Sequence, residues 1–359
     1  MPELSDQIVL PARGSAPVPL SILDLAGVGV GQSTGEALHA TTELAVAAQR
    51  WGYGRFWVAE HHGMPAVASA APPVLLAHLA AHTSTIRLGS GGVMLPNHAP
   101  LTVAEQFGTL AALHPGRIDL GLGRAPGSDQ LTSFALRRRM ENPDEDLVDR
   151  LAELLHFQHG SFPADHPFSR IPATPVSPIP VWLLGSSDFS ARLAGSLGLP
   201  FAFAHHFAGT AMNTALALEI YREAFRPSAM LAEPYPMIGV TVLAADTEQE
   251  ARFLAGPGAL SMLLLRSGRL QQTPTPEQAA AYSYTQAERD LIDAMQASVV
   301  LGTPDQVEAG LRDLVKRFGV SELMLTTRVH GPAERLRSFR LIAERFRMPA
   351  PDPVSTPVQ

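Results

Sequence analysis

Along most of this chain, short apolar runs typical of buried strands alternate with stretches in which apolar residues have helical spacing. Residues 86–127 show this pattern most fully. An apolar, β-branched run at residues 86–95 gives way to apolar positions at helical spacing over residues 103–113, and a second apolar run follows at residues 118–122. This pattern predicts a strand, a helix and a second strand. Two such buried strands, joined through a helix, form one βαβ unit with parallel strands.

The same alternation continues on both sides of this unit. Strands are predicted at residues 20–25, 55–60, 86–95, 118–122, 180–184, 201–204, 237–243 and 322–326. Helices are predicted at residues 35–50, 70–82, 103–113, 144–157, 187–196, 211–225, 248–254, 304–318 and 332–346. Eight strands separated by helices fit a (β/α)8 TIM barrel better than a doubly wound sheet, which has only five or six strands.

Three segments depart from the alternation. Residues 1–17 and 349–359 are rich in proline and small polar residues and lack periodicity. We therefore expect an extended N-terminal tail and a disordered C-terminal tail around a single barrel at residues 18–348. Residues 256–298 are too many for an ordinary βα connection, so they predict an insertion that forms a lid near the C-terminal mouth of the barrel.

The amino-acid composition limits the catalytic chemistry that this protein can perform and the partners that it can bind. The 359 residues include no cysteine, which removes disulfides, thiolate catalysis and thiolate metal sites and agrees with a cytoplasmic location. The single lysine, Lys316, lies in a predicted helix, which nearly excludes Schiff-base chemistry. A net charge of −7 without a basic stripe argues against nucleic acid, and no apolar run reaches the roughly 18 to 20 residues of a membrane span.

Titratable side chains follow the second predicted strand. This strand runs directly into Glu60, His61 and His62, and the C-terminal ends of barrel strands form the active-site face. Histidine titrates near neutrality and suits proton transfer, and the adjacent carboxylate can orient it or a partner. His61 and Glu60 are therefore candidate catalytic residues. His205 and His206 end another strand, where adjacent side chains face opposite ways, so at most one of them points into the mouth.

Glycines gather at the ends of two strands of the first βαβ unit. Gly91 and Gly92 end one strand, and Gly121 and Gly123 end the other, directly before Arg124. Glycine weakens a strand, so its repetition indicates that a large flat group lies close to the backbone. The arginine indicates that this group carries an anion.

A serine-rich helix start follows another strand. Gly185, Ser186 and Ser187 lie where a helix begins, and serines here commonly cap free N–H groups. The same N–H groups can bind a phosphate. Together with Arg124, they predict a phosphate site.

Four segments of this chain resemble, in order, the bacterial luciferase-like flavin-dependent monooxygenases. The segments are FWVAEHHG at residues 56–63, residues 86–127, residues 180–207 and LGTPDQVEAGLRDLVKRFGVSELML at residues 301–325. The resemblance covers residues 19–346. It implies a TIM barrel that binds FMN at its C-terminal mouth and uses reduced flavin and molecular oxygen to oxidise a small organic substrate. It also implies a homodimer.

Individual positions follow from this resemblance. His61 falls on the catalytic histidine, and Gly91 and Gly92 fall on a pair joined by a cis peptide under the flavin ring. Arg124 and Ser186 fall on positions that hold the flavin phosphate. Gly123 replaces the reactive cysteine of bacterial luciferase, and Gly185 replaces a glutamate near the phosphate, so the substrate of luciferase itself is not carried over.

Three other interpretations remain open at this point. A metal-dependent barrel hydrolase or isomerase could use Glu60, His61, His98 and His205 as ligands. A flavin-binding relative without turnover would share the fold, and the deazaflavin F420 could replace FMN. The sequence also leaves open whether FMN binds tightly or arrives reduced from a flavin reductase.

Overall fold

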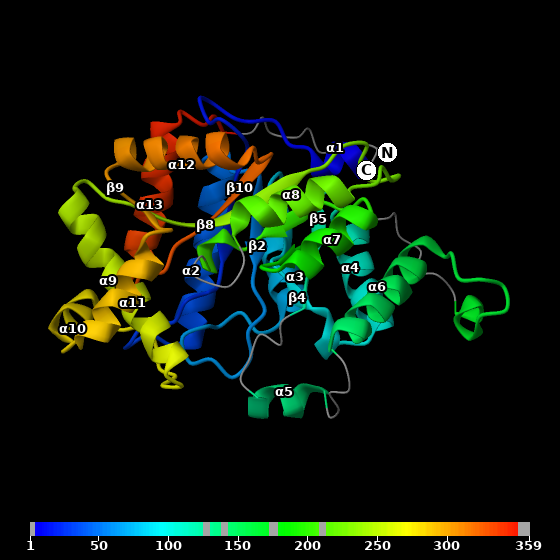
Figure 1. The fold of residues 1–359 in the computed structure, drawn as a ribbon, viewed down its shortest axis with the longest axis horizontal. Coiled ribbons are helices and arrows are strands. Elements are labelled where there is room, and N and C mark those ends of the chain that lie inside the picture. Colours follow the sequence, from blue (N-terminus) through cyan, green and yellow to red (C-terminus); the bar gives the residue numbers. More distant parts are fainter. Residues whose placement is uncertain (1–3, 125–129, 138–142, 172–178, 208–212, 351–359) are drawn as a thin grey trace.

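Eight parallel strands form a closed barrel in the computed structural model, which describes residues 4–124, 130–137, 143–171, 179–207 and 213–350 (Figure 1). The barrel strands are β1 (Leu20–Asp24), β2 (Arg55–Val58), β3 (Arg87–Ser90), β5 (Ile118–Gly123), β6 (Val181–Gly185), β7 (Phe201–Phe203), β8 (Pro236–Ala244) and β10 (Glu322–Thr326). The last strand, β10, pairs in parallel with both β1 and β8, which closes the ring. The (β/α)8 TIM barrel predicted from the sequence is confirmed.

Helices cover the outside of the barrel. They are α2 (Thr34–Arg50), α3 (Pro72–His82), α4 (Pro100–Leu113), α6 (Pro143–His159), α7 (Asp188–Ser196), α8 (Thr214–Ala224), α12 (Pro304–Phe318) and α13 (Pro332–Arg345). Their starts follow capping chemistry: Ser33 and Thr303 each form a capping box, and Pro100 occupies the first turn of α4. Short elements lie between them: η1 (Leu95–Asn97), α5 (Gln130–Arg137), η2 (Pro167–Arg170) and η3 (His205–Phe207).

A buried polar cluster fills the end of the barrel where the strands begin. Arg55, the first residue of β2, binds Asp119 at 2.9 Å and Glu322 at 3.0 Å, and Arg87 binds Asp119 at 2.6 Å. The side chains of Arg55, Asp119 and Glu322 are fully buried. Two guanidinium groups thus face two carboxylates, so that each buried charge has a hydrogen-bonded partner. The closed end of the barrel is therefore structural.

The N-terminal segment differs from the predicted extended tail. Residues Leu4–Ile8 form helix α1, and Ile8 is fully buried. The backbone carbonyls of Gln7 and Ile8 accept hydrogen bonds from the Arg55 guanidinium. This segment folds because its carbonyls supply acceptors to a buried cation that Asp119 and Glu322 do not saturate. The predicted C-terminal tail at residues 349–359 lies almost wholly outside the described residues.

The predicted insertion at residues 256–298 begins later than expected. Helix α9 (Glu248–Arg266) continues through Pro257 instead of ending at Leu254. Its buried Leu260, Leu263 and Leu264 form a second small core with α10 (Pro276–Ala281) and α11 (Gln286–Gln296). This apolar packing outweighs the cost of a proline inside a helix, which is about 3 kcal/mol.

The three helices α9, α10 and α11 lie together on one side of the barrel, and α6 lies on the opposite side (Figure 1). A short strand that the sequence pattern did not predict, β9 (Val300–Gly302), pairs with the end of β8 and leads back to α12.

Candidate active site

An open pocket of about 1000 Å³ lies at the C-terminal mouth of the barrel. Its walls come from the segments that follow β1, β2, β7 and β10, and from one face of α9. His61 lines this pocket, and its backbone N–H is held by the carbonyl of Ser69 at 3.0 Å. His61 therefore lies in a solvent-accessible cavity at the mouth of the barrel, as we expected from its position after a barrel strand.

Glu60 does not line this pocket and instead organises a buried network. It is fully buried, and its Oε1 accepts hydrogen bonds from His62 Nε2 at 2.8 Å and His98 Nε2 at 2.9 Å. Its Oε2 accepts a hydrogen bond from the backbone N–H of Met94 at 3.0 Å. Glu60 thus connects the segment after β2 to the segment that follows β4 (Val93–Met94).

These contacts determine the charge of Glu60. Burial alone would raise its pKa, but the hydrogen bond and positive potential of His98, with further hydrogen bonds from His62 and Met94, hold the pKa below its ordinary value. Glu60 is an ionised carboxylate at neutral pH, so it is suited to position other groups and not to donate a proton. The sequence left open whether Glu60 orients His61 or a partner, and the structure shows that it holds two other histidines.

His205 and His206 do not end a strand as predicted, because β7 ends at Phe203 and both lie in η3, where their side chains have different surroundings. The Nδ1 of His205 lies 2.8 Å from Thr214 Oγ1, and its ring packs on Phe318 of α12. His206 lines a second pocket at the mouth, of about 700 Å³. Burial, followed by the nearby Arg328 charge, lowers the pKa of His206 to about 3, so its imidazole is neutral at physiological pH.

The peptide bond between Gly91 and Gly92 is cis, as predicted. This pair interrupts the strand expected at residues 86–95, which the structure divides into β3 and β4. The register against β5 shifts by one residue across the pair, because Gly89 pairs with Asp119 whereas Val93 pairs with Leu122.

Close packing explains why this backbone is made of glycine. A Cβ atom on Gly92 would lie 2.8 Å from the carbonyl oxygen of Gly121, and one on Gly91 would lie 2.6 Å from a methyl group of Leu23.

The two glycines that depart from bacterial luciferase are also packed. A Cβ on Gly123 would lie 2.9 Å from the sulfur of Met94, and a Cβ on Gly185 would lie 2.4 Å from Ser190. A larger side chain at Gly123 would require the flexible Met94 side chain to move, and one at Gly185 would require Ser190 to move.

Arg124 and the start of α7 come together, although they follow different strands. The Arg124 guanidinium carbon lies 5.3 Å from the centre of the Phe189 ring, and Phe189 is the second residue of α7. Ser187 is the N-cap residue of α7, yet its side chain makes no capping hydrogen bond. Its Oγ is buried and has no hydrogen-bond partner within the described residues. A cation, free N–H groups and an unused hydroxyl therefore meet at one helix start, beside Gly185 and Ser186.

The alternative of a metal centre finds no support in this geometry. His205 contacts Thr214 and packs on Phe318 of α12, whereas the histidines bound to Glu60 are His62 and His98. Within the described segments, no group of three or more histidine, aspartate or glutamate side chains is arranged to hold a metal ion.

The comparisons with known proteins agree with the fold. Residues 18–322 match the luciferase-like monooxygenase family. The chain belongs to this family. The match spans most of the barrel and includes the segments that carry His61, the cis glycine pair, Arg124 and the start of α7.

Three similar proteins show how far the likeness extends. A luciferase-like monooxygenase of Escherichia coli strain K12 is 44% identical over 90% of this chain and 96% of its own. The N-acetyl-S-alkylcysteine monooxygenase of Bacillus subtilis strain 168 is 36% identical over 90% of this chain and 97% of its own. The crystal structure of apo-MsnO8 superimposes with a TM-score of 0.81 at 37% identity and covers 92% of this chain and 99% of its own. This protein therefore belongs to a family of oxidoreductases.

Two features of the mouth were missed by sequence reasoning. Arg328 follows the end of β10 and lines both pockets, and Arg335 of α13 binds Asp24 at the end of β1 at 2.8 Å. The signal for Arg328 resembles the one used for Arg124, because both arginines lie within two residues of the end of a barrel strand. Among the described helices, none is both long and apolar enough to cross a membrane.

Proposed function

We propose that this luciferase-like protein is an FMN-dependent monooxygenase that oxidises a small organic substrate. The observation that carries the proposal is the helix start at α7, where Arg124 lies against Phe189 and the buried Ser187 Oγ lacks a partner within the described residues. A phosphate monoester fits this arrangement, because it supplies acceptor oxygens for N–H and O–H donors and a negative charge for the arginine.

The proposed FMN site extends from this helix start to the glycine pair. Arg124, Ser186, Ser187 and the first N–H groups of α7 would hold the phosphate. The cis Gly91–Gly92 segment would lie against the ring system, with its backbone facing the flat ligand and its Cβ positions turned towards neighbouring protein atoms. When bound and reduced, the flavin supplies the electrons that activate molecular oxygen, as the cofactor does in flavin enzymes generally.

His61 is proposed as the group that moves a proton during turnover. Its position beside the larger pocket brings an imidazole to the place where an organic substrate can enter. Glu60 would act on the site through His62 and His98, by fixing the segments that flank the cis peptide. The face of α9 that borders the pocket would help to exclude water from the reacting groups.

The partners of the reaction are part of the same proposal. A relative that is named for oxidising N-acetyl-S-alkylcysteine supports a small organic substrate with polar and apolar parts. We further propose that the protein acts as a homodimer in the cytoplasm and that a flavin reductase can supply reduced FMN.

A flavin titration followed by an oxygen measurement tests this function. Purified protein is titrated with FMN, riboflavin and F420, and oxygen uptake is then recorded with reduced flavin and a panel of organic acids and thioethers. We expect FMN to bind more tightly than riboflavin or F420, and a member of the panel to be converted to an oxygenated product. Preference for F420 would replace the cofactor in this proposal, and flavin binding without any product would instead favour a non-catalytic relative.

A further inference from the structure

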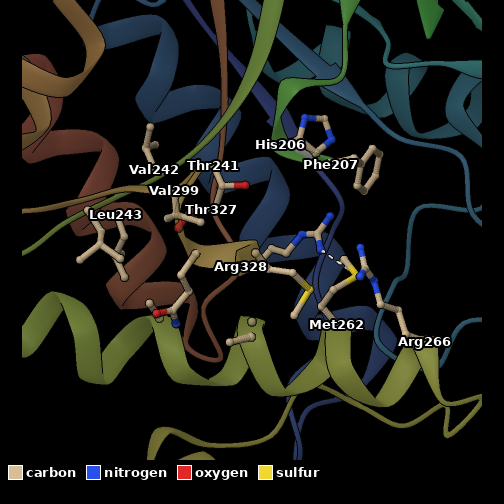
Figure 2. A pocket seen from close by; sticks show the side chains of 16 residues that line it. His206, Phe207, Thr241, Val242, Leu243, Met262, Arg266, Val299, Thr327 and Arg328 are labelled. Carbon is tan, nitrogen blue, oxygen red and sulfur yellow. Dashed lines mark hydrogen bonds between the residues drawn. The ribbon is translucent and has the colours of Figure 1, made fainter. Parts of the chain in front are cut away.

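Arg328 occupies a central place between the two pockets at the mouth. It lies two residues beyond the end of β10 and lines both cavities. Figure 2 shows its side chain extending towards Met262 of α9, beneath His206 and Phe207. The two cavities share the residues Phe207, Gly258, Met262, Thr327 and Arg328. A ligand in either cavity would therefore meet this guanidinium group.

No carboxylate neutralises Arg328 within the described part of the chain. Its contacts there are the sulfur of Met262 at 4.0 Å and the ring of Phe207, whose centre lies 5.7 Å from the guanidinium carbon. The other arginines that line the larger pocket are paired: Arg335 binds Asp24 at 2.8 Å, and Arg269 lies 3.8 Å from Glu288. The excess positive charge of this pocket is thus located at Arg328.

Unpaired polar atoms gather around this charge. Arg328 Nε, Thr327 Oγ1, Ser261 Oγ and His206 Nδ1 are buried and have no hydrogen-bond partner among the described residues. All four residues line one or both of the two pockets. Buried polar groups are nearly always hydrogen-bonded in folded proteins, and each unpaired group costs about 1 to 3 kcal/mol. Three such atoms on neighbouring residues, together with the unpaired Nε of the cation itself, indicate a polar ligand.

At neutral pH, Arg328 keeps its positive charge and the neighbouring His206 is uncharged. Burial lowers the pKa of Arg328 to about 10, which still leaves the guanidinium charged. His206 remains neutral and adds no charge of either sign. The remaining walls are largely apolar, with Met64, Val67 and Leu264 among the lining side chains. The matching ligand has one anionic group and an apolar body.

The order of the barrel strands separates this site from the proposed phosphate site. Around the ring, Arg328 follows β10, His61 follows β2, the glycine pair follows β3 and Arg124 follows β5. Arg328 and Arg124 thus lie at the two ends of an arc of five strands, with His61 and the cis peptide between them. In this order, one anion-binding arginine lies at each end of the arc, and His61 and the proposed flavin ring site lie between them.

We propose that Arg328 binds the carboxylate of the organic substrate, whose apolar part lies in the pocket beside His61 and α9. The hydroxyls of Thr327 and Ser261 complete the anion site, because each can donate a hydrogen bond to a carboxylate oxygen. The substrate class is accordingly a small carboxylic acid with an apolar chain. This assignment of a substrate rests on the proposed monooxygenase function.

The test compares acids with their neutral amides on the flavin-free protein. Straight-chain carboxylates from butanoate to decanoate, and the corresponding primary amides, are titrated into wild-type protein by calorimetry at pH 7.5. At least one acid should bind about tenfold or more tightly than its amide, which is the scale of a hydrogen bond to a charged group. Arg328→Gln should abolish this preference, and Arg328→Lys should restore part of it.

Matched controls make each outcome decisive. Arg340→Gln removes one positive charge from the outer surface of α13 and should retain the preference for the acid. Equal binding of acids and amides to wild-type protein would overturn the proposal, and that comparison does not depend on a variant that folds. An unchanged preference in a folded Arg328→Gln protein would also overturn it. A loss confined to the affinity for reduced FMN would assign Arg328 to the cofactor instead.

Failure of this inference can be told apart from failure of the proposed function. FMN titration of the same Arg328→Gln protein reports the flavin site independently, and its affinity should stay within about threefold of the wild-type value because Arg328 and Arg124 follow different strands. Tight FMN binding with no preference for acids would leave a monooxygenase with a different substrate class. Acid binding without FMN binding would support the carboxylate site and contradict the proposed FMN-dependent function.

Discussion

The Arg124 guanidinium carbon lies 5.3 Å from the centre of the Phe189 ring, so an arginine that follows β5 rests on the first turn of α7. This contact brings a fixed cation to a helix N-terminus, where the helix dipole already favours negative charge. The combination is the basis of the phosphate site proposed for FMN.

Removing this cation should affect FMN and riboflavin unequally. Arg124→Ala should weaken FMN by roughly 10- to 150-fold, because a hydrogen bond to a charged group is worth about 1.5 to 3 kcal/mol. Riboflavin, which has no phosphate, should lose little affinity. Fluorescence titration of both ligands measures the difference. Arg192→Ala, on the exposed face of the same helix, is the matched control, and equal losses for both ligands would contradict the assignment.

His61 should matter for turnover much more than for folding. His61→Ala should reduce substrate-dependent oxygen consumption by about 100-fold or more, which is the usual scale for a lost general acid or base. The melting temperature should change little, because the side chain lines an open pocket. His78→Ala, on the outer helix α3, should retain full activity. A large loss of stability with activity per folded molecule retained would return His61 to a structural role.

Glu60 should contribute to stability in a pH-dependent way. Its pKa in the folded state lies below the ordinary value of 4.5. The ionised form is therefore stabilised by folding, and this contribution is present above pH 4.5 and is lost as the pH falls through the lower folded value. Glu60→Gln should cost about 1.5 to 3 kcal/mol at pH 7, since it removes charge-assisted hydrogen bonds from two histidines.

Urea unfolding at several pH values measures this effect. The difference between wild type and Glu60→Gln should shrink steadily below pH 4.5, because the glutamine does not titrate. Glu105→Gln, on the exposed face of α4, should stay within about 0.5 kcal/mol of wild type. A difference that is constant from pH 3 to pH 7 would show that the ionised carboxylate is not what stabilises the fold.

The glycine pair should not tolerate a side chain at its second position. In Gly92→Ala, the new Cβ would lie 2.8 Å from the carbonyl oxygen of Gly121, which is backbone and has little freedom to move. Unfolding free energy should fall by about 1 to 3 kcal/mol, the usual cost of overpacking. Gly35→Ala, in the first turn of α2 with no close neighbour but the Ser33 hydroxyl, should be neutral or stabilising. Equal stabilities for the two variants would refute the steric argument.

Local patterns were enough to predict the barrel, because each of the eight barrel strands and most of the helices that follow them are encoded by their own periodicity and caps. The end of α9 was predicted wrongly because Pro257 is a strong local stop signal, and only the packing of Leu263 and Leu264 on a neighbouring helix overrides it. Helix α1 was missed for a similar reason, since its carbonyls find their donor in Arg55, far along the chain.

The features of the site also differ in whether they could be predicted from the sequence. The positions of His61 and Arg124 followed from their place after strands, and the cis bond between Gly91 and Gly92 followed from the family resemblance. The partners of Glu60 and the unbalanced charge of Arg328 depend on contacts between distant segments. The local sequence around each residue does not specify which distant residue it will contact.

The charged cluster at the closed end of the barrel has a consequence for the chain as it emerges from the ribosome. Arg55 is made early, whereas its partner Glu322 lies in the last barrel strand. Until residues 322–326 have left the exit tunnel, any barrel-like intermediate would enclose a guanidinium group that lacks one of its two carboxylates. Completion of the interior therefore waits for the synthesis of β10, and the nascent chain needs protection from aggregation up to that moment.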